Sequence, residues 1–400
     1  MGRNIRKSSA PRLARAWNGP TVLSYGFRPF FLLGPVLAVL AIANWLLLLA
    51  GSGAEPRAIA PLDWHIHEML FGYTSAAIAG FLLTAVPNWT GRLPVTGWPL
   101  MWLALVWIAG RLAMLAPTGS WLGPVVEAAF LPLLAAFLAR EVIKGRNWRN
   151  LKVLGPILLL AGANIWFHVE ARSGDADMAI RLGFGAILLL IMLIGGRVTP
   201  SFTRNWLARQ EPGRMPQPFN RFDALAMAVS ALALLGWVVA PEQPTVALPL
   251  ALAGALQALR QSRWAGLRCL RNPLLLVLHV FYGFIALGLM LMAAAVWWQD
   301  QAATSAALHL WGIGAIGGMT VAVSARATLG HTGRELRSDA ALNIVFSLIA
   351  LTALARALAA FLPQAGWLIT LAGSLWIAAF ALFAFHAGPW LLRPRVPKAR

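Results

Sequence analysis

The sequence predicts an all-α polytopic membrane protein with about twelve transmembrane helices. Of the 400 residues, 59% are hydrophobic and 12% are charged, and the mean hydropathy is +0.68. A water-soluble chain of this size needs more polar side chains to cover its surface. The single cysteine, Cys269, excludes an internal disulfide and a CxxC metal or redox site. Any metal must therefore be bound by histidine, carboxylate or methionine side chains.

Apolar runs of about 17–25 residues, long enough to cross a bilayer, occur at twelve places. They lie at roughly 29–50, 64–86, 98–116, 121–140, 152–170, 178–196, 222–240, 244–260, 273–298, 304–329, 339–362 and 365–388. The longest connection, 197–221, is too short for a separate soluble domain. We therefore expect one transmembrane domain over 29–390, a basic cytoplasmic segment at 1–28 and a basic cytoplasmic tail at 391–400.

The net charge of +19 predicts how the chain is oriented in the membrane. Lysine and arginine concentrate in alternate connections, beginning with the N-terminal segment. Five of the 33 fall elsewhere: Arg57, Arg172 and Arg181 in the opposite connections, and Arg111 and Arg356 within helices. Basic connections stay in the cytoplasm, so both termini are expected there. The distribution of charge thus indicates the orientation of the chain in a lipid bilayer, which is its expected partner. It does not indicate nucleic acid binding.

The second and tenth apolar runs align over 28 residues when His67 is set on His309. In both runs, 23 positions separate the histidine from the first residue of a Thr-Gly-Arg triplet, Thr90-Gly91-Arg92 or Thr332-Gly333-Arg334. The sixth run ends in a weaker match, Gly195-Gly196-Arg197. Runs four spans apart indicate three pseudo-repeated four-helix units, since repeats commonly build large membrane folds. The alternative is chance, because glycine often ends helices and arginine collects on the cytoplasmic side.

Ionisable side chains at membrane depth are costly, so they are candidate functional residues. The seven histidines are His65, His67, His168, His279, His309, His331 and His386. His65 and His67 are two positions apart, which places them about 200° apart on a helix, so they do not ligate one ion together unless the helix starts between them. The alternative for His168, His331 and His386 is a hydrogen-bonded packing role.

His67 and His309 are expected at the same depth on two helices, which suits a shared ligand. Two neutral imidazoles are the usual axial pair of a b-type haem, whose propionates need cations. The haem candidates are His67, His309, His65, Arg111 and Arg356. The alternative for the two arginines is an ion pair with Glu68 or Glu127. The small residues of the tenth run permit close helix packing or a flat macrocycle; they are Gly312, Gly314, Ala315, Gly317 and Gly318.

Several stretches resemble the NnrS family over most of the chain, from about residue 24 to the last helix. They are His65 to Gly72, Ala79 to Arg92, Gly195 to Val198, Pro200 to Thr203, Pro273 to Tyr282, and His309 with Gly330 to Arg334. The resemblance implies a multi-pass protein of the bacterial inner membrane that binds haem and copper. It also implies protection against nitric oxide, the source of nitrosative stress.

The implied copper needs further ligands. Copper(II) favours imidazole, and copper(I) also accepts methionine or cysteine. The metal candidates are His65, His279 and His331, and further candidates are Glu68, Tyr282 and His168. Tyr282 is expected one turn from His279, similar to the histidine and tyrosine neighbours of oxidase copper sites.

The helix count, orientation and histidines on the second and tenth helices also resemble haem-copper oxidases. The chain lacks their histidine cluster on the sixth and seventh helices, so their binuclear centre is not expected. A haem oxidoreductase that binds or converts nitric oxide is the favoured function. The alternatives are a twelve-helix secondary transporter and a haem or copper assembly factor. The connection 87–94 lacks the Asp-Arg-x-Gly-Arg-Arg pattern of the major facilitator transporters, and no docking motif for an electron donor is present.

Overall fold

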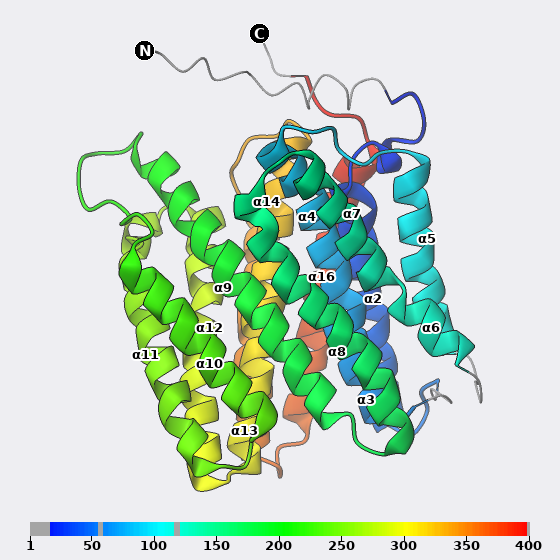
Figure 1. Cartoon of the computed structure of the whole chain (residues 1–400), viewed down its shortest axis with the longest axis vertical. Helices are drawn as coiled ribbons and strands as arrows, with labels where there is room; N and C mark the ends of the chain where they lie inside the picture. Colours follow the sequence, from blue (N-terminus) through cyan, green and yellow to red (C-terminus); the bar gives the residue numbers. More distant parts are fainter. Residues whose placement is uncertain (1–16, 55–58, 116–120, 398–400) are drawn as a thin grey trace.

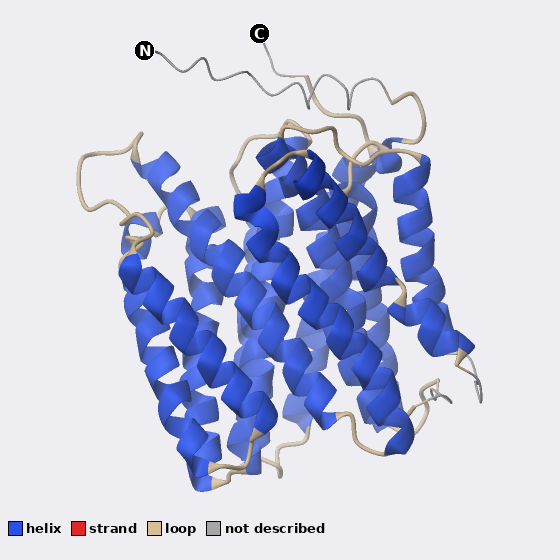
Figure 2. Cartoon of the chain, viewed as in Figure 1, coloured by secondary structure: helices blue, strands red, loops and turns tan. Residues whose placement is uncertain are grey.

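The computed structural model describes residues 17–54, 59–115 and 121–397, and all regular structure within them is helical (Figure 2). A helix occupies each of the twelve predicted positions. Within these ranges, ten helical stretches are long and apolar enough to cross a membrane. The other two, α5 and α11, have 16 residues each. Of the predicted terminal segments, residues 1–16 and 398–400 lie outside the described residues, as does Arg57.

The helices follow one another in chain order (Figure 1). They are α2 (Phe27–Leu49), α3 (Pro61–His67), η3 (Glu68–Tyr73), α4 (Thr74–Thr90), α5 (Trp98–Ala113), α6 (Leu122–Ala128), α7 (Phe130–Lys144), α8 (Leu154–Ser173), α9 (Asp177–Leu207), α10 (Arg221–Val239), α11 (Ala247–Ser262), α12 (Pro273–Trp298), α13 (Gln301–His309), η7 (Leu310–Gly317), α14 (Gly318–His331), α15 (Ala340–Phe361) and α16 (Trp367–Leu392). Side chains cap the N-termini of several of these helices. Asn220 forms a capping box with Asp223, and Asp300 accepts from the N–H groups of Ala302 and Ala303.

The first and last described segments lie at the same end of the bundle (Figure 1). The N–H of Gly97 donates to the carbonyl of Leu23, and the N–H of Val396 donates to that of Thr332, each at 2.9 Å. We call this the basic end, because most described arginines of the connections lie there. The placement agrees with an even number of crossings. The side of the membrane that the basic end faces stays a prediction from charge.

The two helices that carry His67 and His309 share a local irregularity. The π-helical segments η3 and η7 begin directly after these histidines, at Glu68 and Leu310. A π-turn widens the helix and rotates the side chains that follow it, and such turns are frequent at functional sites. The helices that continue from these segments, α4 and α14, are each followed by a left-handed glycine, Gly91 at φ 70° and Gly333 at φ 83°. Corresponding sequence positions thus have corresponding backbone shapes.

The third sequence match has a different structural role. Gly195-Gly196-Arg197 was expected at a helix end, but α9 continues through it and through Pro200 to Leu207. A Cβ added to Gly196 would lie 2.8 Å from Cζ of Arg260. Gly196 therefore provides space for a neighbouring guanidinium and does not end a helix.

The glycines of η7 and α14 are covered by aromatic rings of neighbouring helices. A Cβ added to Gly314, Gly317 or Gly318 would meet the rings of Phe284, Trp376 and Phe281, respectively. Because these rings fill the space, a flat macrocycle does not fit against this backbone. Close helix packing is the interpretation that the structure supports.

We expect Gly318→Ala to destabilise the protein by about 1–3 kcal/mol, because the added methyl group overlaps the buried Phe281 ring. The matched control is Gly162→Ala on α8, where an added Cβ has nothing within 4 Å. The control should melt at or above the wild-type temperature, since alanine favours a helix more than glycine does. Thermal melting in detergent measures both variants, and equal melting of the two would contradict the packing argument.

Candidate functional site

A buried polar cluster lies near the end of the bundle opposite the basic end. It joins side chains from α3, η3, α5, α6 and α8, and we call it the histidine–glutamate cluster. Its members are His67, Glu68, Arg111, Glu127, Asn164 and His168, none more than 8% exposed. Polar groups buried at this depth need partners, and the cluster supplies them.

Glu127 is the centre of this cluster. Its Oε2 accepts a hydrogen bond from Nδ2 of Asn164 at 2.9 Å. The same oxygen lies 2.8 Å from Nε2 of His168 and 3.3 Å from Nε2 of His67. Its Oε1 accepts from Nη2 of Arg111. One carboxylate therefore connects α3, α5 and α8 to α6.

Both ring nitrogens of His67 are engaged in this cluster. Its Nδ1 lies 3.2 Å from Oε1 of Glu68, and its Nε2 lies 3.1 Å from Oδ1 of Asn164. Nη1 of Arg111 donates to the same Oε1 of Glu68 at 2.8 Å. Arg111 thus makes the ion pairs that were the alternative to a haem contact. Two carboxylates and one guanidinium leave one negative charge, which a proton on an imidazole or a metal cation would balance.

Three atoms of the cluster have the spacing of metal ligands. One ligand atom each from His67, Glu127 and His168 all lie within 4.8 Å of one another, and no other such group occurs in the described part of the chain. Ligands about 2.0–2.1 Å from one ion lie roughly 3 Å apart. Two imidazoles and a carboxylate suit copper(II) or iron(II) better than calcium or magnesium.

The sequence named these three side chains but did not group them. Glu127 was expected only as an arginine partner, and His168 only as a further candidate. Asn164 was missed. A signal was present, because Asn164 and His168 are one turn apart and so share a face of an apolar helix.

A second pair of histidines lies on the same two helices as the expected axial pair. Nδ1 of His309 donates to the carbonyl of Ser305 at 2.7 Å, which leaves the Nε2 lone pair free. The ring of His65 stacks on Trp45 with centroids 4.6 Å apart, and its buried Nδ1 has no hydrogen-bond partner. Arg356 on α15 acts electrostatically on both imidazoles, and His65 acts on His309. His67 thus belongs to the histidine–glutamate cluster, and His65 and His309 have other partners.

The copper candidates predicted from the sequence are not brought together. Nε2 of His279 lies 2.9 Å from Oγ1 of Thr203, near the start of α12. His331, at the end of α14, packs its ring 5.5 Å from those of Tyr25 and Phe27. His65 lies at the opposite end of the bundle, so no common ion joins it to the other two.

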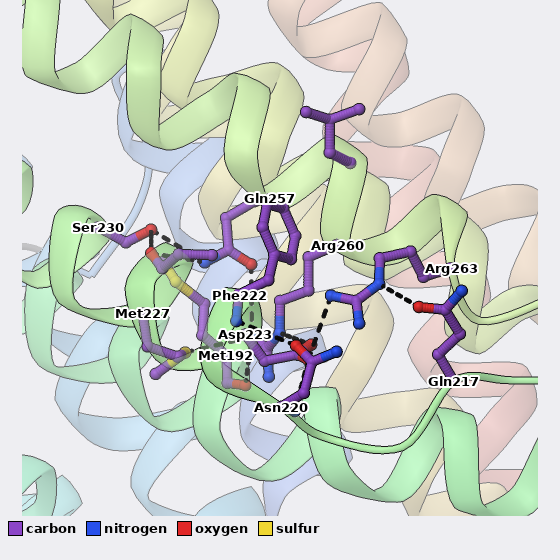
Figure 3. Close-up of polar contacts among 12 residues, drawn as sticks. Met192, Gln217, Asn220, Phe222, Asp223, Met227, Ser230, Gln257, Arg260 and Arg263 are labelled. Carbon is purple, nitrogen blue, oxygen red and sulfur yellow. Dashed lines mark hydrogen bonds and ion pairs between the residues drawn. The ribbon is translucent and has the colours of Figure 1, made fainter.

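A second ionic network surrounds Arg260 near the basic end (Figure 3). Nε of this buried arginine donates to Oδ1 of Asp223 at 3.2 Å, and its Nη1 donates to the hydroxyl of Tyr282 at 3.0 Å. That hydroxyl donates to Oε1 of Gln257 at 2.9 Å, and Nε2 of Gln257 donates to Oγ of Ser230 at 2.9 Å. The network ties α10, α11 and α12 together, and it assigns Tyr282 to packing of these helices.

An apolar cleft lies between α4, α9 and α14. Its lining includes Ile78, Leu190 and Met319, and no ionisable side chain lines it. At its edge the hydroxyl of Tyr73 lies 2.6 Å from Oγ1 of Thr320. The cleft therefore offers a metal no imidazole or carboxylate, and its only sulfur ligand is the thioether of Met319.

Comparison with known proteins confirms the family resemblance. A family model described as "NnrS protein" matches residues 21–395. No curated protein matches the chain. The match contains every helix that contributes to the two histidine groups. The chain therefore belongs to the NnrS family.

Proposed function

We propose that this protein binds copper and haem in the bacterial inner membrane and acts on nitric oxide as part of the response to that gas. Family membership supports the link to nitric oxide. The observation that carries the metal site is the buried group of His67, Glu127 and His168. Nothing in this group or in the family match favours the transporter or the assembly factor.

The histidine–glutamate cluster has the donors and the second layer of contacts that a copper ion needs. Arg111 binds Oε1 of Glu127, so Oε2 remains directed at the two imidazoles. Glu68 lies beside Nδ1 of His67 and would hold its proton there, which leaves Nε2 as the metal ligand. Carboxylates in this position orient metal-binding histidines and increase their basicity. A cation would also balance the remaining negative charge.

We assign the iron of the haem to His65 and His309, the two imidazoles on α3 and α13 outside the histidine–glutamate cluster. The hydrogen bond to Ser305 places the proton of His309 on Nδ1 and keeps Nε2 available. The unpartnered Nδ1 of His65 is a buried group that still requires a partner. Arg356 would supply a cation for a propionate. When bound, haem iron and copper would supply one-electron chemistry and a position for nitric oxide.

Optical spectra of detergent-purified protein test the haem site. We expect His65→Ala and His309→Ala each to lose most of the Soret absorbance per protein, because each removes an iron ligand. His67→Ala should retain the band. The control is His386→Ala, which removes an imidazole paired with Asp339 at the basic end.

Spectra in three states complete this test: oxidised, reduced, and reduced with nitric oxide. Metal analysis is carried out on the same samples. A Soret band that shifts with the gas supports direct action on nitric oxide. Full haem in both His65→Ala and His309→Ala would refute this ligand pair.

A further inference from the structure

Four arginines and one histidine gather at the basic end, where α2 begins, α14 ends and the chain leaves α16. They are Arg28, His331, Arg334, Arg393 and Arg395. Nη1 of Arg28 donates to the carbonyls of Leu391 at 2.6 Å and of Arg393 at 2.9 Å, so α2 holds the last turn of α16. We call this group the arginine cluster.

The Thr-Gly-Arg triplet of α14 places the chain after α16 against this cluster. The N–H of Val396 donates to the carbonyl of Thr332 at 2.9 Å. Gly333 is left-handed, and a Cβ there would collide with the carbonyl oxygen of Val396. The guanidinium of Arg334 lies over the Trp390 ring, 5.0 Å from its centroid. The chain around Arg395 is thereby held against the Thr332-Gly333 turn that precedes Arg334.

The arginine cluster lacks carboxylates. Within the described ranges, none of its arginines has an acidic oxygen within 4.0 Å. The corresponding triplet of α4 differs, because its Arg92 pairs with Glu141 at 2.5 Å. Asp339 is already paired with His386 at 2.7 Å. Among the described residues, no carboxylate within 4.0 Å therefore offsets the mutual repulsion of these arginines.

Two guanidinium nitrogens in the cluster are buried without a partner among the described residues. They are Nε of Arg28, a residue only 4% exposed, and Nη1 of Arg334. Burial, and then the charge of Arg393, lowers the pKa of Arg334. Buried donors without acceptors and unpaired buried charges both cost free energy. A bound oxyanion would satisfy the donors and offset the repulsion.

The surroundings favour an anion that is attached to lipid. The cluster lies where helices end, at the level of the bilayer surface, and basic pockets between helices there bind anionic headgroups. Phe385 and Leu392 on α16 are 83% and 53% exposed, respectively. They are seven residues apart and so share one face of the helix that leads to the cluster. Acyl chains would pack on this face while a phosphate contacts the arginines.

We infer that the arginine cluster is a binding site for the phosphate headgroup of an anionic phospholipid. Arg28 and Arg334 supply the buried donors, and Arg393 and Arg395 supply charge at the rim. Such a lipid would join α2, α14 and the chain after α16. The site is independent of the proposed haem and copper sites, which lie at the other end of the bundle.

The melting temperature of delipidated full-length protein tests this site. It is measured in detergent with and without phosphatidylglycerol, which is added as mixed micelles. We expect phosphatidylglycerol to raise the melting temperature and to remain bound in native mass spectra. The double variant Arg334→Gln/Arg395→Gln should lower the apparent affinity roughly thirtyfold, since each arginine near an anionic headgroup contributes about fivefold. Arg28 is left unchanged because it also caps α16. The matched control Arg271→Gln, exposed at the same end, should bind as the wild type does.

Three results would overturn the inference. Phosphatidylcholine that stabilises as well as phosphatidylglycerol would remove the requirement for net negative charge. Inorganic phosphate that reproduces the full effect would make the ligand a free oxyanion. Unchanged phosphatidylglycerol affinity in the double variant would place the lipid elsewhere. The Soret band of each variant is recorded in parallel, so loss of lipid binding is distinguished from loss of haem.

Discussion

Replacing Glu127 with alanine is expected to abolish copper binding and to lower the free energy of unfolding by about 3–5 kcal/mol. The substitution removes the oxygen that lies between Nε2 of His67 and Nε2 of His168, and it leaves Arg111 with only Glu68 as an ion-pair partner. Buried guanidinium and imidazole groups cannot regain water in this position. Both losses are therefore expected from a single change.

Glu127→Gln separates the two effects. It keeps the shape of the side chain and one of its two acceptor oxygens but removes the charge, so the stability loss should be smaller than in Glu127→Ala while copper binding still falls. Metal content per protein and thermal melting in detergent measure the two quantities. Glu242→Gln, an exposed acid at the same end, is the control. Full copper occupancy in Glu127→Gln and in His168→Ala would place the copper elsewhere in the protein.

The second large effect is expected in the network around Arg260. Asp223→Ala removes the carboxylate that accepts from Nε of Arg260 and lies 3.2 Å from Nη1 of Arg263. Arg260 is 1% exposed, so its charge stays buried without a counterion. We expect a loss of about 3–5 kcal/mol in stability. Haem and copper content of the folded protein should not change, because the network lies near the opposite end.

A double variant tests whether the unpaired buried charge of Arg260 causes this loss. Asp223→Ala/Arg260→Met removes both charges, and it should regain much of the stability that Asp223→Ala loses. Asp177→Ala is the control, since its carboxylate is 76% exposed and 3.8 Å from Arg181. That surface pair should contribute at most about 1 kcal/mol. If Asp223→Ala has the same melting temperature as Asp177→Ala, the network does not hold α10, α11 and α12 together.

The fold class could be predicted because a bilayer imposes a simple requirement on sequence. A spanning helix satisfies its own backbone hydrogen bonds and needs a long apolar run, so each helix is visible in its own residues. The predicted end of α9 was wrong for a related reason. Hydropathy shows where a helix leaves the hydrocarbon, and α9 continues past that point to Leu207. The three-unit repeat and the orientation stay predictions.

The candidate site could be predicted only in part. The periodicity of a helix separates His65 from His67, and the structure places them in different groups. Their partners were beyond the reach of sequence patterns. Glu127, Asn164 and His168 come from α6 and α8, and only the packing of these helices against α3 brings them to His67.

The sequence by itself determined the membrane class, the helix positions and the NnrS family, and it named several of the buried ionisable side chains. Each of these depends on residues close together in the chain or on long matching stretches. The tertiary structure decided which histidine faces which partner, that Arg111 binds two carboxylates, and that Arg334 has none while Arg92 has Glu141. Contacts between helices depend on how the helices rotate and pack, and the spacing of residues along one helix does not encode that.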